Sequence, residues 1–228
     1  MDRIGVITGL VGEAECLDVL AEPERPATEV AGANALRARA SASALVARGC
    51  RALLSFGVAG GLDPALRAGD LVLARSVCAT DGRTFATDEA WRERLEAALD
   101  GLVPVAIADF AGSERMIATP VEKAALRQAT GAAAVDMESH GVALAANEAG
   151  VPFLVLRAIA DSAADAIPEW VLDGVAADGS LDPKRIAARL FVRPWAVWSL
   201  IGAARNNGRA LSSLRRVALL AGGRFRFA

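Results

Sequence analysis

The chain has 228 residues, of which 54% are hydrophobic and 23% charged, and its mean hydropathy is +0.34. Such a composition can bury a sizeable core, so it excludes an intrinsically disordered chain and favours one large domain. No uncharged apolar run reaches the ~18 residues that span a bilayer, and the N-terminus lacks the long apolar stretch of a signal peptide. Three widely spaced cysteines and a single histidine, His140, argue against a zinc site and for a reduced, cytoplasmic compartment.

The charges are unevenly distributed, although they sum to only −2. Ten of the 25 basic residues, and none of the 27 acidic residues, lie between Lys184 and Ala228. Residues 1–183 therefore carry a net charge of −12. We expect residues 1–183 to form the folded domain and residues 184–228 to form a basic, amphipathic helical segment.

Apolar runs and helical patterns alternate along the first 160 residues. Strands are predicted at Arg3–Leu10, Ala52–Phe56, Asp70–Ala74, Val103–Ala108 and Phe153–Ile159. Helices are predicted at Ala42–Arg48, Asp88–Leu99, Pro120–Ala129 and Glu138–Ala149. This order indicates an α/β fold, a single domain with a central mixed β-sheet flanked by helices. In such sheets, ligands bind at the carboxyl ends of the strands.

A glycine-rich segment, Gly57–Leu62, follows the second predicted strand and ends it. Glycines allow the backbone to approach a ligand closely, but a plain turn would have the same composition. The segment is neither a dinucleotide-binding fingerprint nor a phosphate-binding P-loop, because no Lys-Ser/Thr pair follows it.

Acidic residues follow two of the predicted strands and one further apolar run. Asp136 and Glu138 flank Met137, and carboxylates at such a place suit the vicinal hydroxyls of a sugar. Asp161 follows a strongly apolar strand, where partial burial would raise its pKa and suit it to general acid catalysis. Glu13 follows the first strand. Each has an ordinary alternative, since Asp136 and Asp161 could cap helices and Glu13 could lie on the surface.

Together, these segments resemble the nucleoside phosphorylase and nucleosidase superfamily, in particular the nucleosidases that act on methylthioadenosine and adenosylhomocysteine. The resemblance rests on the order and spacing of GVAGGLDPALRAGDLVLA, AVDMES and RAIADSAAD, and it extends from residue 4 to about residue 165. It implies a nucleoside-phosphorylase-like fold and an enzyme that cleaves the N-glycosidic bond of a 5′-substituted adenosine. It also implies a homo-oligomer that needs no cofactor or metal.

The resemblance assigns roles to individual residues. Asp161 would protonate adenine N7, Glu13 would activate water, and Glu138 would hold the ribose 2′- and 3′-hydroxyls above Met137. A protonated base and an activated water are what this bond needs, since an unprotonated purine is a poor leaving group. The other substrate-binding residues that it implies are Asp136, Met116, Ile117, Val58, Ala59 and Gly60.

Departures from the family pattern favour hydrolysis over phosphorolysis. The first loop, Thr8–Glu15, has no arginine, and Val58 stands where relatives commonly carry a serine, so phosphate loses donors. Ala160 replaces a common serine beside the acid, and the stretch Ala31–Arg48 is shorter than in typical relatives. Phosphorolysis with phosphate as co-substrate remains open. So do a methylthioadenosine or adenosylhomocysteine nucleosidase and a non-catalytic protein that binds a nucleoside or a lipid.

The basic segment 184–228 combines arginines with Trp195 and Trp198 around an apolar stripe. Such a pattern suits peripheral contact with the inner face of an anionic membrane. The alternative is a helix packed on the sheet, with its arginines paired to the acidic body. We do not expect nucleic-acid binding, because few polar side chains of this segment could read bases. The segment and the V-D-M-E-S-H element are similar to those of hopanoid-associated members of the superfamily, whose implied substrate is adenosylhopane.

Overall fold

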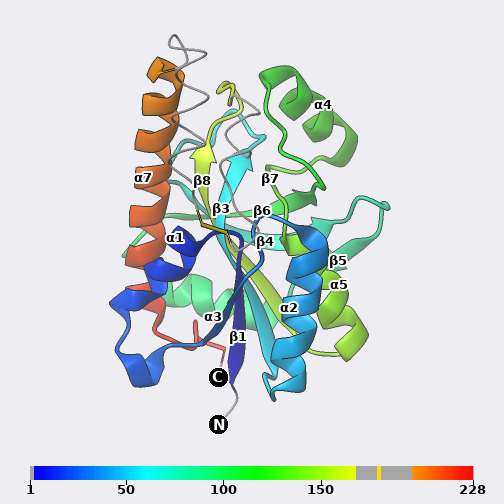
Figure 1. The fold of residues 1–228 in the computed structure, drawn as a ribbon, viewed down its shortest axis with the longest axis vertical. Helices are drawn as coiled ribbons and strands as arrows, with labels where there is room; N and C mark the ends of the chain where they lie inside the picture. Colours follow the sequence, from blue (N-terminus) through cyan, green and yellow to red (C-terminus); the bar gives the residue numbers. More distant parts are fainter. Residues whose placement is uncertain (1–2, 168–178, 181–196, 228) are drawn as a thin grey trace.

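The structure is a computed structural model, and it describes residues 3–167, 179–180 and 197–227. Its centre is a mixed eight-stranded β-sheet with helices on both faces (Figure 1). The strands are β1 (Ile4–Thr8), β2 (Ala27–Val30), β3 (Ala52–Gly61), β4 (Leu71–Cys78), β5 (Thr84–Ala86), β6 (Val105–Gly112), β7 (Ala134–Asp136) and β8 (Phe153–Asp161). The α-helices are α1 (Val11–Ala14), α2 (Ala35–Ala47), α3 (Glu89–Leu99), α4 (Pro120–Thr130), α5 (Ser139–Ala149) and α7 (Val197–Ala221), and two 3₁₀ turns are η1 (Glu15–Val19) and η2 (Glu22–Glu24).

The sheet curls until five of its strands close into a ring. β3 pairs with β8 in parallel and with β7 antiparallel, while β4 pairs with β6 in parallel and with β8 antiparallel. β6 pairs with β7 in parallel and completes the ring. β1 and β2 extend the sheet from β3, and β5 extends it from β4. The mixed sheet flanked by helices is therefore confirmed.

Two apolar cores lie on the two faces of the sheet. Successive residues of a strand point to opposite faces, so Val6 packs in one core and Ile7 in the other. The first core also contains α3, η1 and the C-terminal half of α7, and the second contains α2 and α5 (Figure 1). Near-continuous apolar runs in β3 and β8 follow from this burial on both sides.

The C-terminal half of α7 is part of the first core. Ala210, Leu214 and Val217 are completely buried there, and Trp91 Nε1 of α3 donates a hydrogen bond of 2.6 Å to the carbonyl of Phe225. This half of the helix therefore packs on the sheet, as expected in the alternative to membrane contact. Within the described residues, however, none of the arginines of this segment forms an ion pair with a carboxylate. The arginines of this segment that the structure describes are all exposed, and they are Arg205, Arg209, Arg215, Arg216, Arg224 and Arg226.

Several element boundaries differ from the sequence predictions. β3 continues through the glycines to Gly61, so the prediction that Gly57 ends this strand was wrong. α2 begins at Ala35, where Asn34 Oδ1 accepts a hydrogen bond from the backbone N–H of Arg37, and not at Ala42. The short strands β2, β5 and β7 were not predicted. Trp195 and the side chain of Trp198 lie outside the part that the structure describes. No helix among the described residues is long and apolar enough to cross a membrane.

Candidate functional site

The ten site residues that the sequence singled out all line one cavity of about 150 Å³. The cavity lies where the carboxyl ends of β1, β3, β7 and β8 meet, and segments far apart in the sequence contribute to it. Glu13 comes from α1, Val58, Ala59 and Gly60 from β3, Met116 and Ile117 from the loop after β6, Asp136, Met137 and Glu138 from β7 and the residues after it, and Asp161 from the end of β8.

Glu13 is buried and held by three backbone N–H groups. Its Oε2 accepts hydrogen bonds from Gly9 at 2.7 Å and Leu10 at 2.9 Å, and its Oε1 accepts one from Val58 at 2.8 Å. Burial raises the pKa of Glu13, while Arg157 and the three N–H groups oppose the rise. A fixed carboxylate whose pKa lies above its usual value suits a general base near neutral pH.

Behind the cavity wall, Arg157 organises the other carboxyls. This completely buried side chain of β8 lies with Nε 2.9 Å from Asp136 Oδ2, and its NH2 donates to Glu138 Oε2 at 3.1 Å and to Ser55 Oγ at 2.7 Å. Asp136 Oδ1 also accepts from the backbone N–H of Glu138 at 3.1 Å and of Ser139 at 2.8 Å. Asp136 therefore accepts hydrogen bonds from backbone N–H groups at the start of α5 and also pairs with Arg157. The expected helix-capping role and a position at the site thus occur together.

Glu138 is 4% exposed, and burial raises its pKa to about 8. Arg157 opposes this rise, whereas the neighbouring carboxyls of Asp136 and Glu13 add to it. The backbone of Gly9 separates Glu138 from Glu13. A Cβ at this position would lie 2.6 Å from Glu138 Oε1 and 3.3 Å from Glu13 Oε2, so a larger residue here would displace the Glu138 carboxyl.

Asp161 ends β8 on the other side of the cavity. Its Oδ1 accepts a hydrogen bond from Nζ of Lys123, whose side chain is completely buried. Burial raises the pKa of Asp161, and the Lys123 ammonium opposes the rise. The residues that follow Asp161 form a turn, so within the described residues it caps no helix.

The arrangement places one acid at each end of a short stretch of β3. Glu13 bonds the N–H of Val58, and Asp161 pairs in register with Gly60, two residues further on. Two strand residues span about 7 Å. With a carboxyl at each end, this stretch of the cavity can support a reaction in which one group accepts a proton and the other donates one.

Sequence reasoning missed two charged residues of this site, Arg157 and Lys123. Arg157 had a visible signal, since it is a single charge inside the otherwise apolar strand Phe153–Ile159. Lys123 had none in its local pattern, because a lysine in the first turns of a helix is ordinarily exposed.

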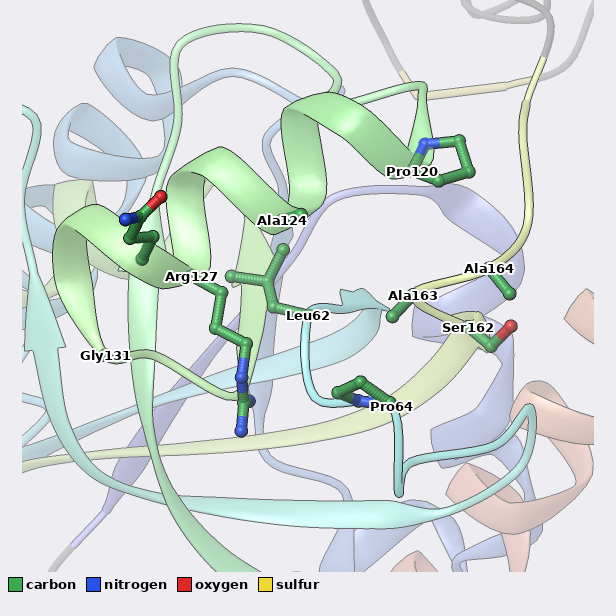
Figure 2. Close-up of a pocket in the computed structure, with 10 residues that line it drawn as sticks. Leu62, Pro64, Pro120, Ala124, Arg127, Gly131, Ser162, Ala163 and Ala164 are labelled. Carbon is green, nitrogen blue, oxygen red and sulfur yellow. The ribbon is translucent and has the colours of Figure 1, made fainter.

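A second cavity, of about 630 Å³, lies beside α4 (Figure 2). Ala124 and Arg127 of α4 line it, together with Leu62 and Pro64 after β3 and the turn from Ser162 to Ala164. Among the described residues that line it, Arg127 is the only basic one, and it donates to Asp63 at 2.8 Å. The part of its lining that the structure describes contains no set of carboxyls comparable with that of the first cavity.

The chain is similar to known proteins in sequence and in fold. The family model described as the phosphorylase superfamily matches residues 6–190. The aminodeoxyfutalosine nucleosidase of Campylobacter jejuni is 31% identical over 143 residues, which are 55% of this chain and 62% of that protein. The chain thus matches less than two thirds of the length of this relative.

Solved structures share the fold at lower identity. The methylthioadenosine/adenosylhomocysteine nucleosidase of Neisseria meningitidis superposes with a TM-score of 0.74 at 17% identity, over 96% of this chain and 98% of that one. The futalosine hydrolase of Helicobacter pylori gives 0.70 at 16% identity, over 95% and 97%. Since these matches span nearly the whole chain, the similarity in fold extends beyond the motif region into the C-terminal helix.

Proposed function

The chain belongs to the phosphorylase superfamily, and from this premise we propose that it hydrolyses the N-glycosidic bond of a 5′-substituted adenosine and releases adenine. The observation that carries the proposal is the set of acids around one cavity, Glu13, Glu138 and Asp161. Asp161 gives a proton to N7 of the leaving adenine, and Glu13 takes one from the attacking water. Glu138 binds the ribose hydroxyls.

Hydrolysis is favoured over phosphorolysis by the scarcity of free cations. Among the described residues that line the cavity, Arg115 is the only basic one, and its NH1 donates to Glu122 at 2.7 Å. Arg157 is engaged by Asp136 and Glu138. A phosphate dianion would therefore meet mainly carboxylates, whereas water needs only the base at Glu13.

The finer proposal for the substrate is adenosylhopane, an adenosine whose 5′-carbon bears a triterpenoid. Its support is the exposed arginine face of α7, which pairs with no carboxylate among the described residues and is free to meet anionic lipid. Such a face would bring the enzyme to the membrane that holds an apolar substrate. Methylthioadenosine is the soluble alternative.

The experiment is adenine release from 5′-methylthioadenosine, followed with and without phosphate, together with identification of the sugar. We expect release at equal rates in both conditions and a free sugar as product. A strict phosphate requirement with a sugar 1-phosphate as product would contradict hydrolysis. Binding of adenosine compounds with no cleavage over several hours would instead identify a non-catalytic binding protein.

A further inference from the structure

Lys123 occupies a place that is unusual for a lysine. Its side chain is completely buried in α4, although neighbouring Val121 is exposed. The chain uses arginine 23 times and lysine only twice, at positions 123 and 184. Burying an ammonium group is strongly unfavourable unless its charge and its hydrogen bonds are matched, so this lysine requires a dedicated set of acceptors.

The structure supplies one acceptor for each of its three N–H bonds. Nζ of Lys123 donates to Asp161 Oδ1, to the carbonyl of Ser162 at 2.6 Å and to the carbonyl of Asp165 at 3.0 Å. The Asp165 carboxylate in turn accepts from the N–H and the Oγ of Ser162, each at 2.8 Å. This closed turn aims both carbonyls at Lys123.

The other end of the contact is also fixed. α4 begins with a capping box, in which Thr119 Oγ1 accepts from the N–H of Glu122 at 3.2 Å and Glu122 Oε2 accepts from the N–H of Thr119 at 3.0 Å. Three converging acceptors match the compact ammonium of a lysine and not the planar fork of an arginine. The helix and the turn together therefore form a receptor for one ammonium group beside Asp161.

We propose that Lys123 is a positioning residue for the reaction. It holds Oδ1 of Asp161, so that Oδ2 is the oxygen presented to the cavity, and it stabilises the negative charge that Asp161 acquires when it gives up its proton. This inference rests on the proposed function, since it concerns the acid of that reaction.

The proton step is simple in this arrangement. The Oδ2–H bond of Asp161 breaks, the N7–H bond of adenine forms, and the electron pair of the broken bond stays on the carboxylate beside Lys123. No proton leaves Lys123. Burial alone would make Asp161 a reluctant donor because it raises the pKa, and the ammonium opposes this effect.

The test is to measure kcat, KM and the pH profile of adenine release for Lys123→Met. We expect kcat to fall about 10²-fold, the loss typical of removing a group that stabilises a developing charge, with KM changed little. The alkaline limb of the profile should move to higher pH, because Asp161 without the cation keeps its proton longer. Arg127→Met is the matched control. Arg127 lies on the same helix as Lys123 and also pairs with an aspartate, Asp63, but this pair lies outside the site.

A merely structural role would lower the amount of active enzyme without moving the alkaline limb, and this outcome, or an unchanged kcat, would overturn the inference. Wild-type protein without activity on any adenosine would instead refute the proposed function.

If Lys123→Met does not fold, NMR of wild-type protein with labelled lysine keeps the inference testable. Only two lysine signals are present, and Lys184→Met assigns them. Asp161→Asn should shift the Lys123 signal and leave that of Lys184 in place. An unmoved Lys123 signal would overturn the inference.

Discussion

The guanidinium of Arg157 lies 3.1 Å from Oε2 of Glu138, and both side chains are almost completely buried. The same guanidinium holds Asp136, and Glu13 is close enough to influence the pKa of Glu138. Three buried carboxyls thus share one cation. Since three carboxylates would exceed its charge, the cluster favours retaining a proton, and Glu138 is the group whose pKa rises to about 8.

The raised pKa of Glu138 predicts a stability that depends on pH. The folded protein binds a proton that the unfolded chain releases above about pH 4.5. The stabilisation is therefore complete below this pH and is lost as the pH rises through about 8. We expect the free energy of urea unfolding to fall between pH 5 and pH 8, and to fall less in Glu138→Gln. Glu148→Gln, at an exposed glutamate, should behave as wild type, and equal slopes in all three proteins would contradict this account.

Removing Arg157 should destabilise the fold severely. Arg157→Met leaves Asp136 and Glu138 buried without their cation, and breaking a buried pair in this way costs about 3–5 kcal/mol. The control is Arg39→Met, which breaks an exposed ion pair with Glu148 and should cost less than about 1 kcal/mol. Urea unfolding followed by tryptophan fluorescence measures both. Similar losses in the two variants would show that the Arg157 cluster contributes no more than a surface pair.

Glu13 and Glu15 provide a matched pair for testing the base. Glu13 is buried at the cavity and Glu15 is exposed two residues further on. We expect Glu13→Gln to lower kcat about 10²- to 10⁴-fold, because an amide cannot accept the proton of the attacking water. Glu15→Gln should retain full activity, and circular dichroism should show both variants folded. Full activity of folded Glu13→Gln would assign the base elsewhere.

The arginine face of α7 predicts binding to anionic vesicles. Each basic residue near such a surface contributes roughly 1 kcal/mol, and salt weakens the attraction. Co-sedimentation should decrease at high salt and in Arg205→Ala/Arg209→Ala, while Arg39→Ala on α2 should bind as wild type. Activity on 5′-methylthioadenosine should be the same in all three proteins. Vesicle binding that changes neither with salt nor in the double variant would remove the physical support for adenosylhopane as the substrate.

Much of the fold was predictable because buried strands and capped helices have local patterns. Asp88 preceding α3 and Gly150 ending α5 are examples, and both boundaries were predicted closely. The glycines of β3 misled the prediction, since their composition is that of a turn. Position 57 lies inside the strand and is occupied by glycine, since a Cβ there would lie 2.6 Å from Glu13 Cδ and 2.5 Å from NH1 of Arg157. This constraint comes from side chains distant in the sequence.

The site was predictable in its residues but not in its electrostatics. The ten residues that the motifs singled out all line the cavity, but other lining residues, such as Gly9, Ala33 and Ile167, were not singled out. Lys123 escaped notice because its burial depends on Asp161 and on the turn at Asp165, 38 and 42 residues away. A local pattern carries no information about such partners.

The measurement closest to the central claim compares two leaving groups in wild type and Asp161→Asn. Adenine must be protonated as it leaves, whereas a 4-nitrophenolate does not need a proton. We predict that Asp161→Asn releases adenine from 5′-methylthioadenosine at least about 10²-fold more slowly than wild type. The same variant should cleave 4-nitrophenyl riboside at nearly the wild-type rate. An equal loss on both substrates, or full adenine release by the folded variant, would contradict the assignment of Asp161 as the acid.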